Sequence, residues 1–195
     1  YTLTYTATDA AGNTSGASRT ITVTDVAAPV ITLSGSGTVT HEGGATYTDA
    51  GATATDAVDG TVSVTTTGSV TEGTVGDYTL TYSATDAAGN TATSTRVVSV
   101  TDTTGPVISV SGSTTITHEA AATYTDAGAT AVDVVGGTLS VTTSGTVTVG
   151  TPGAYTLTYS VTDASGNTTT ATRTVTVQDT VGPVITLSGT GTVNH

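Results

Sequence analysis

Apolar and polar residues alternate along several stretches of this chain with a period of two, which is the pattern of a half-buried β-strand. In residues 78–85, Tyr, Leu, Tyr and Ala alternate with Thr and Ser, so one face of the predicted strand is apolar and the other carries hydroxyl groups. The loop 86–90 follows, and its Asp, Gly and Asn residues predict a hairpin turn. No segment shows the period of 3.6 residues that indicates a helix.

Short strands separated by Gly-rich turns are predicted throughout residues 26–102. They lie near residues 30–34, 37–41, 45–55, 61–67, 69–72, 77–85 and 92–101. Pro29 stands at the start of the first strand, where a missing backbone N–H is tolerated. Six or seven short strands at this spacing predict an all-β fold, an antiparallel β-sandwich.

The pattern recurs with a period of 77 residues and without insertion or deletion. The segments PVITLSGSGTVTHE, PVISVSGSTTITHE and PVITLSGTGTVNH begin at Pro29, Pro106 and Pro183. We therefore expect a tandem array of sandwiches, of which the chain is a window. The expected domains are the end of one repeat (1–25), two complete repeats (26–102 and 103–179) and the start of another (180–195).

Composition removes several classes of function. The chain has no Cys, so it offers no disulfide or thiolate chemistry. Its net charge of −12, from 15 acidic and 3 basic residues, disfavours nucleic acid and anionic membranes as partners. No apolar run is long enough to insert into a bilayer. No arrangement of nucleophile, base and acid can be argued from the spacing, so we expect no enzymatic activity and no catalytic residue.

Three motifs carry a resemblance to a known family: P-V-I-T-L at the start of the repeat, Y-T-D-A-G-A-T in its middle and T-D-A-A-G-N-T near its end. The repeat resembles the bacterial immunoglobulin-like repeats of surface proteins and adhesins, and it is also similar to hyalin-type repeats. The resemblance implies tandem immunoglobulin-like sandwiches on the outside of a bacterial cell, without catalysis. It implies no particular ligand.

In an immunoglobulin-like sandwich, acidic residues of several loops are expected at the end that receives the preceding repeat. Because Ca²⁺ accepts carboxylate and carbonyl oxygens in loose geometry, this gathering predicts a Ca²⁺ ion at each junction between repeats. The alternative is that these residues only end strands and cap turns. The second junction has Gly136 where the first has Asp59, which counts against an ion there. The candidate ligands are Asp25, Asp56, Asp59, Asp86 and Asn90 at one junction and Asp102, Asp133, Asp163 and Asn167 at the next.

Two other kinds of polar residue recur once in each repeat. His41, His118 and His195 end a strand pattern, and the first two precede a Glu; we interpret each His–Glu pair as a polar strand end, because adjacent strand residues point to opposite faces. Arg19, Arg96 and Arg173 each stand two residues before an apolar residue of the same predicted strand, so each shares the core-facing side of its strand. We expect each Arg to extend from the core to the end of the sandwich and to meet a carboxylate there.

The function predicted from these features is that of a structural spacer or stalk in an extracellular bacterial surface protein, adhesin or fibre. The linker 26–28 is too short to behave as a flexible coil, so neighbouring repeats of the same chain are the expected partners. Two alternatives remain open. The chain could be a subunit of an extracellular filament, paired through strands with identical chains. It could also be an adhesion module that binds a glycan or a host protein.

Overall fold

The computed structural model describes residues 1–186 and 188. The chain divides into two units: Tyr1–His41 with Ala45–Thr101, and Glu42–Gly44 with Asp102–His195. The predicted start of a further repeat, 180–195, lies partly outside the described residues, and His195 lies wholly outside them. Within the described residues, no helix is long and apolar enough to cross a membrane.

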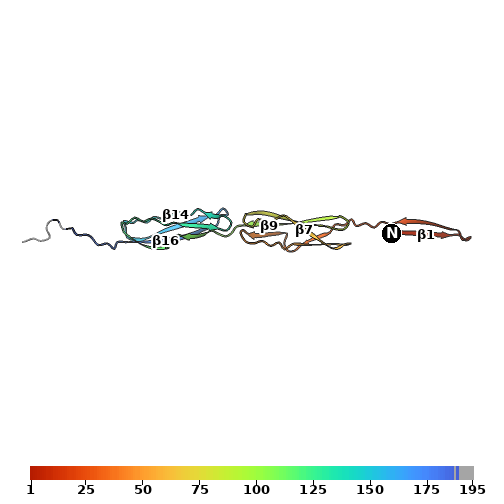
Figure 1. The fold of residues 1–195 in the computed structure, drawn as a ribbon, viewed down its shortest axis with the longest axis horizontal. Helices are drawn as coiled ribbons and strands as arrows, with labels where there is room; N and C mark the ends of the chain where they lie inside the picture. Colours follow the sequence, from red (N-terminus) through yellow and green to blue (C-terminus); the bar gives the residue numbers. More distant parts are fainter. Residues whose placement is uncertain (187, 189–195) are drawn as a thin grey trace, which may run out of the picture. The chain divides into compact units, whose positions relative to one another are not determined.

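The first complete sandwich is made of two small sheets that face each other (Figure 1). One sheet has the order β3-β5-β6 and the other the order β4-β9-β8-β7. The strands are β3 (Val30–Leu33), β4 (Thr38–Glu42), β5 (Ala52–Asp56), β6 (Gly60–Val62), β7 (Val64–Thr67), β8 (Gly76–Thr85) and β9 (Thr91–Thr101). This all-β, immunoglobulin-like architecture confirms the fold class predicted from the period-two pattern.

The second sandwich repeats the same arrangement, with sheet orders β10-β12-β13 and β11-β16-β15-β14. Its strands are β10 (Val107–Val110), β11 (Thr115–Glu119), β12 (Ala129–Asp133), β13 (Gly137–Leu139), β14 (Thr142–Ser144), β15 (Gly153–Thr162) and β16 (Thr168–Gln178). One pair departs from the antiparallel pattern, because β11 runs parallel to β16. A separate hairpin, β1 (Thr2–Thr8) with β2 (Thr14–Thr20), precedes both sandwiches in the sequence.

Three details of the strand prediction were wrong. The predicted strand 45–55 is extended only from residue 52, since Gly51 adopts a positive φ of 75° just before β5. The predicted strand 61–67 is divided between the two sheets, with Ser63 as the residue between β6 and β7. Residues 69–72 form no strand, because the chain turns away at Gly68. A Cβ at Gly68 would lie 2.4 Å from the carbonyl oxygen of Thr79, so only glycine fits this turn.

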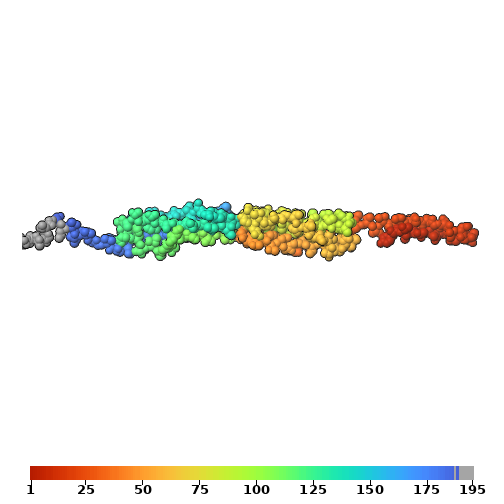
Figure 2. Space-filling model, in the orientation of Figure 1, coloured from red at the N-terminus to blue at the C-terminus, as the bar shows by residue number. Residues whose placement is uncertain are grey.

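The longest strands supply most of the core. Leu80 and Tyr82 of β8 and Val98 and Val100 of β9 are fully buried, while their neighbours along each strand are more exposed. The equivalent residues of the second sandwich are also buried. Figure 2 shows the outer surface of residues 30–101, coloured orange to yellow-green.

A buried guanidinium group lies in each core. Arg96 is only 1% exposed, and it forms an ion pair with Asp49. Its Nε atom donates a hydrogen bond to the carbonyl oxygen of Ser36 at 3.0 Å, and Nη2 donates to that of Ser34 at 2.6 Å. The hydroxyl of Tyr82 donates to Asp49 Oδ1 at 2.7 Å. Ser34 and Ser36 share the loop between β3 and β4, whereas Asp49 and Tyr82 come from other segments, so the guanidinium connects parts of the sandwich that are distant in sequence.

The expectation for these arginines was therefore half right. Arg96 and Arg173 do face the core and do meet a carboxylate, Asp49 and Asp126 respectively. They do not reach the end of the sandwich, because β9 and β16 place them in the middle of a strand and the carboxylate comes inward to them.

The ion pair shifts the pKa values of its members. Burial acts to raise the pKa of Asp49, but the hydrogen bond from Tyr82 and the interactions with Arg96 outweigh it, so the pKa lies below its usual value. Burial and the neighbouring Asp49 raise the pKa of Tyr82 to about 12. The carboxylate is thus charged and the phenol protonated over the whole physiological range. Asp126 and Tyr159 shift in the same directions.

We predict that acid destabilises both sandwiches through these ion pairs. A carboxyl group whose pKa is lowered by folding stabilises the folded state above its unfolded pKa of about 3.9, and this contribution is lost as the pH falls through the lower folded pKa. The melting temperature should therefore fall steeply below about pH 4. Thermal unfolding of the chain, followed by circular dichroism at a series of pH values, measures this.

The variant Asp49→Asn isolates one ion pair. It leaves Arg96 buried without a countercharge, so we expect a loss of about 3 kcal/mol in the first sandwich at neutral pH and a smaller dependence on acid. The exposed Asp77→Asn is the matched control, with the same change of charge. Equal stability of the two variants would contradict a structural role for the pair.

Candidate metal centres

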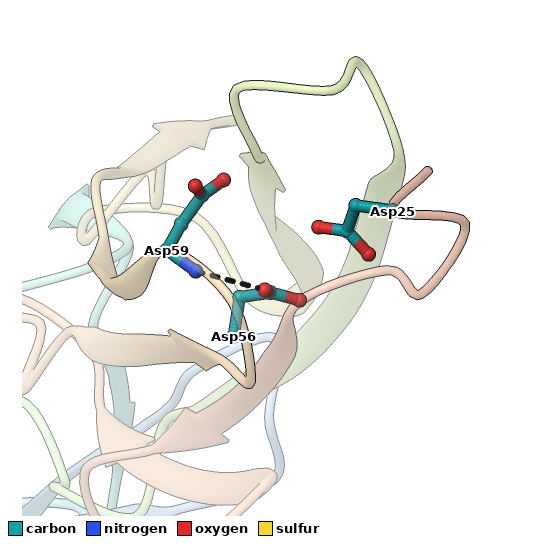
Figure 3. A group of neighbouring side chains, drawn as sticks. All are labelled: Asp25, Asp56 and Asp59. Atoms are coloured by element: carbon teal, nitrogen blue, oxygen red, sulfur yellow. Dashed lines mark hydrogen bonds between the residues drawn. The ribbon is translucent and has the colours of Figure 1, made fainter. Parts of the chain in front are cut away.

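The first group of acidic residues lies within the first unit. Asp25 follows the hairpin β1–β2 in the sequence, Asp56 is the last residue of β5, and Asp59 lies in the turn before β6. One carboxylate oxygen of each lies within 4.8 Å of the others. Figure 3 shows the side chains of Asp25 and Asp56 directed toward each other. The structure thus places together three of the five residues proposed as ligands at this junction.

Asp56 holds its own loop in place. Its Oδ1 atom accepts hydrogen bonds from the backbone N–H groups of Val58, at 2.7 Å, and Asp59, at 3.1 Å. Its Oδ2 atom is buried and has no hydrogen-bond partner among the described residues. The same is true of Asp25, whose Oδ1 accepts from the N–H of Ala27 at 3.1 Å while Oδ2 has no partner. Each carboxylate therefore uses one oxygen locally and keeps the other available.

Asp86 and Asn90 form the adjoining hairpin loop between β8 and β9. Asp86 accepts hydrogen bonds from the backbone N–H of Asn90 at 2.7 Å and from its side-chain amide at 2.8 Å. Burial acts to raise the pKa of Asp86, but these hydrogen bonds outweigh it and lower the pKa. The amide of Asn90 also lies 3.5 Å from the carbonyl oxygen of Asp25. Asp86 and Asn90 thus brace the loop beside the cluster, and Asp86 is not one of its three carboxylates.

The second group lies within the second unit and consists of Asp102, Asp133 and Asp163, all buried. Asp133 repeats the behaviour of Asp56: Oδ1 accepts from the N–H groups of Val135 at 2.8 Å and Gly136 at 2.6 Å, and Oδ2 is buried without a partner. Oxygen atoms of the three carboxylates again lie within 4.8 Å of one another. The second group therefore contains three neighbouring carboxylates, the same number as the first.

The third carboxylate differs between the two groups. Gly136 replaces Asp59, but Asp163, the counterpart of Asp86, lies within range and completes the second group. Its Oδ2 atom accepts a hydrogen bond from the side-chain amide of Asn167 at 2.9 Å. Asn167 also donates to the carbonyl oxygen of Asp102 at 3.2 Å. The substitution by glycine thus changes which loop supplies the third carboxylate and does not reduce their number.

Among residues 1–186, no basic side chain forms an ion pair with either group. The chain has only three basic residues apart from histidine, all of them Arg. Arg96 and Arg173 are ion-paired with Asp49 and Asp126 in the cores. Arg19 lies in β2 and is exposed. Because like charges at this distance repel, a bound cation would stabilise a group of three carboxylates. The donors are oxygens alone, which suits a hard cation and excludes the thiolate and imidazole ligands typical of zinc sites.

Two functional glutamates were missed by the sequence analysis, which interpreted each as one half of a polar His–Glu pair. Glu119 accepts hydrogen bonds from the N–H of Thr180 at 2.9 Å and from its hydroxyl at 2.6 Å. Glu42, which belongs to the second unit, accepts from the same groups of Thr103 at 2.9 and 2.8 Å. A threonine directly after the aspartate that follows the last strand was the signal in the sequence. His41 and His118 bond only to carbonyl oxygens of the adjoining turn.

The fold and these groups define tandem immunoglobulin-like domains with carboxylate clusters formed by loops. A family model described as "Bacterial surface protein, Ig-like domain" matches residues 31–100 and again 108–177. The chain belongs to this family, as the resemblance of its repeats implied. Comparison with curated proteins found no match.

Solved structures give weaker similarities. The lipoprotein BT2262 from Bacteroides thetaiotaomicron is 31% identical over 40% of this chain and 40% of its own, with a TM-score of 0.36. The M60 catalytic domain with two CBM51 domains of Clostridium perfringens ZmpB is 13% identical over 89% of this chain, with a TM-score of 0.44. The chain spans 40% of the first structure and 33% of the second. At these scores, neither likeness bears on the function of this chain.

We predict that Asn167→Ala loosens the second cluster. The variant removes the amide donor from Asp163 and from the carbonyl oxygen of Asp102, so we expect the second sandwich to lose about 1–2 kcal/mol in free energy of unfolding. Urea unfolding measures the loss. Asn13→Ala is the matched control, because Asn13 bonds Asp9 in the same way within an exposed hairpin loop. A loss no larger than that of the control would show that the contact with Asp102 contributes nothing.

Proposed function

We propose that this chain is an extracellular spacer of a bacterial surface protein, which supplies length and stiffness and performs no reaction. The observation that carries the proposal is the fixed path of residues 102–106. β9 ends at Thr101, and Asp102 follows it directly. The residues from Asp102 onward belong to the second unit and make contacts within it.

Four contacts hold this short segment. The side chain of Asn167 donates to the carbonyl oxygen of Asp102. Glu42 accepts hydrogen bonds from the N–H and hydroxyl of Thr103, and also from the hydroxyl of Thr104 at 2.8 Å. Gly105 passes so close to β16 that a Cβ there would lie 2.9 Å from Thr169 Oγ1. Pro106 is fully buried.

Because residues 102–106 all make contacts, this linker has little conformational freedom. Gly- and Ser-rich linkers, in contrast, behave as random coils. Repeated at intervals of 77 residues, such a linker favours restricted bending along a tandem array. Antiparallel strands with long ladders, such as β8 with β9, add resistance to extension within each sandwich. Membership of a family of bacterial surface proteins agrees with a position outside the cell.

Spin labels test the stiffness of the linker. The chain has no cysteine, so single cysteines at Thr66 in β7 and Thr143 in β14, which are exposed and equivalent, can be labelled without side reactions. We expect a narrow distribution of label-to-label distances by pulsed electron–electron double resonance. Insertion of Gly-Ser between Thr103 and Thr104 is the control, and we expect it to widen the distribution by about twofold or more.

A distribution that is already broad in the native chain, and that the insertion does not change, would contradict the spacer. Size-exclusion chromatography with light scattering on the same samples examines the filament alternative: a spacer gives one mass, while a filament subunit gives a mass that grows with concentration.

A further inference from the structure

The strongest unexplained feature of the described residues is a set of three buried carboxylate oxygens without partners, the Oδ2 atoms of Asp25, Asp56 and Asp133. Two of them belong to residues that are themselves buried. Asp56 is 8% exposed and Asp133 is 4% exposed. In both residues Oδ1 accepts two backbone hydrogen bonds, whereas Oδ2 has no hydrogen-bond partner within residues 1–186. A buried acceptor that lacks a partner loses its hydration without compensation, so such atoms in folded proteins call for a specific explanation.

The surroundings of these oxygens identify the missing partner as a cation. Each is one of three carboxylates with oxygens within 4.8 Å of one another, and no arginine is available to either group. Oxygens that bind one Ca²⁺ at 2.3–2.6 Å lie up to about 5 Å apart, so the spacing in both groups fits a single ion. A hydrogen-bond donor from the protein would satisfy one oxygen but would leave the charge of the group unbalanced.

We propose that each carboxylate group binds one Ca²⁺ ion and that the ion fastens the linker to the loops of the sandwich that follows it. The first site consists of Asp25, Asp56 and Asp59, and the second of Asp102, Asp133 and Asp163. In each site one ligand, Asp25 or Asp102, comes from the segment that precedes the sandwich in the sequence. The other two come from a strand end and a loop of that sandwich. The ion therefore reinforces the same segment that the proposed spacer function depends on, and this part of the inference rests on that function.

The donor set favours Ca²⁺ over the other common divalent cations. Zinc sites use histidine and cysteine, and neither group contains them. Magnesium demands near-ideal octahedral geometry with oxygens at 2.0–2.1 Å and keeps most of its water. The carboxylates come from two segments in the first site and from three in the second, and such sets are better suited to the larger and more variable shell of Ca²⁺. Extracellular calcium modules bind with dissociation constants of about 10⁻⁴–10⁻³ M, which sets the concentration for the test.

The test is calorimetric titration of the 195-residue chain with CaCl₂ after removal of metals, together with thermal unfolding. We expect two Ca²⁺ ions per chain and a rise in melting temperature of about 5 °C or more in excess millimolar Ca²⁺, reversed by EDTA. MgCl₂ at the same ionic strength should give less than half of this rise. Asp56→Asn and Asp133→Asn should each reduce the stoichiometry to one ion, and the double variant should bind none.

These variants are designed to fold. Asparagine keeps the Oδ1 acceptor that holds the loop, and it removes the unpartnered charge. The double variant in EDTA should therefore melt no lower than the native chain in EDTA. The exposed Asp59→Asn provides a second test of the first site if Asp56→Asn fails to fold, with binding at that site weakened about tenfold or more. Asp77→Asn is the control for charge alone and should retain both ions.

Two results would overturn the inference: no heat and no change in melting temperature with Ca²⁺, or an equal rise in the native chain and in the double variant, which would indicate charge screening. The spin-label distances separate this failure from failure of the spacer. A narrow distance distribution in a chain that binds no Ca²⁺ would contradict the Ca²⁺ sites and support the spacer function. A broad distribution in a chain with two bound Ca²⁺ ions would contradict the spacer function and support the Ca²⁺ sites.

Discussion

A guanidinium group without access to solvent organises each sandwich, and the rest of the structure depends on its neutralisation. Arg96 draws Asp49, Tyr82 and two backbone carbonyl groups into one network, and Arg173 does the same with Asp126 and Tyr159. A buried charge is tolerated only when it is paired and hydrogen-bonded. The segment that carries Asp49 must therefore pass inward, and it cannot continue the neighbouring strand. In a core whose only aromatic residues are tyrosines, this network adds the directional contacts that apolar packing lacks.

The same constraint places the carboxylates at the end of the sandwich. Asp49 and the carbonyl oxygen of Gly51 contact Arg96, and Gly51 adopts a positive φ, so β5 begins only at Ala52. It ends at Asp56, where the chain turns toward Asp59. The hairpin loop that contains Asn90 lies beside this turn and contacts the linker through the carbonyl oxygen of Asp25. One basic residue in each repeat is used in the core, so none remains to balance the acidic end. The buried ion pair in the core and the unbalanced carboxylates at the end are thus two consequences of a composition with few positive charges.

Sequence patterns predicted the features that depend on local chemistry. Alternation identified β8 and β9, the Asp-Ala-Ala-Gly-Asn loop identified the hairpin between them, and the exact recurrence of motifs identified the repeat. The gathering of Asp25 with Asp56 was also accessible, because it follows from the order of loops in a sandwich. The pairing of Arg96 with Asp49 was not, since 47 residues separate them and no local pattern relates them. The hydrogen bonds from Thr103 to Glu42 could not be predicted either, because 61 residues separate the two and no local pattern relates them.

The most direct measurement of the central claim is the mobility of the linker backbone. Nitrogen-15 relaxation reports order parameters for the N–H groups of residues 102–105 on the picosecond-to-nanosecond timescale. Contacts with Glu42 and Asn167 predict values of about 0.85, equal to those of the strands on either side. Values below about 0.6, typical of flexible segments, would show that the linker is free and would contradict the account.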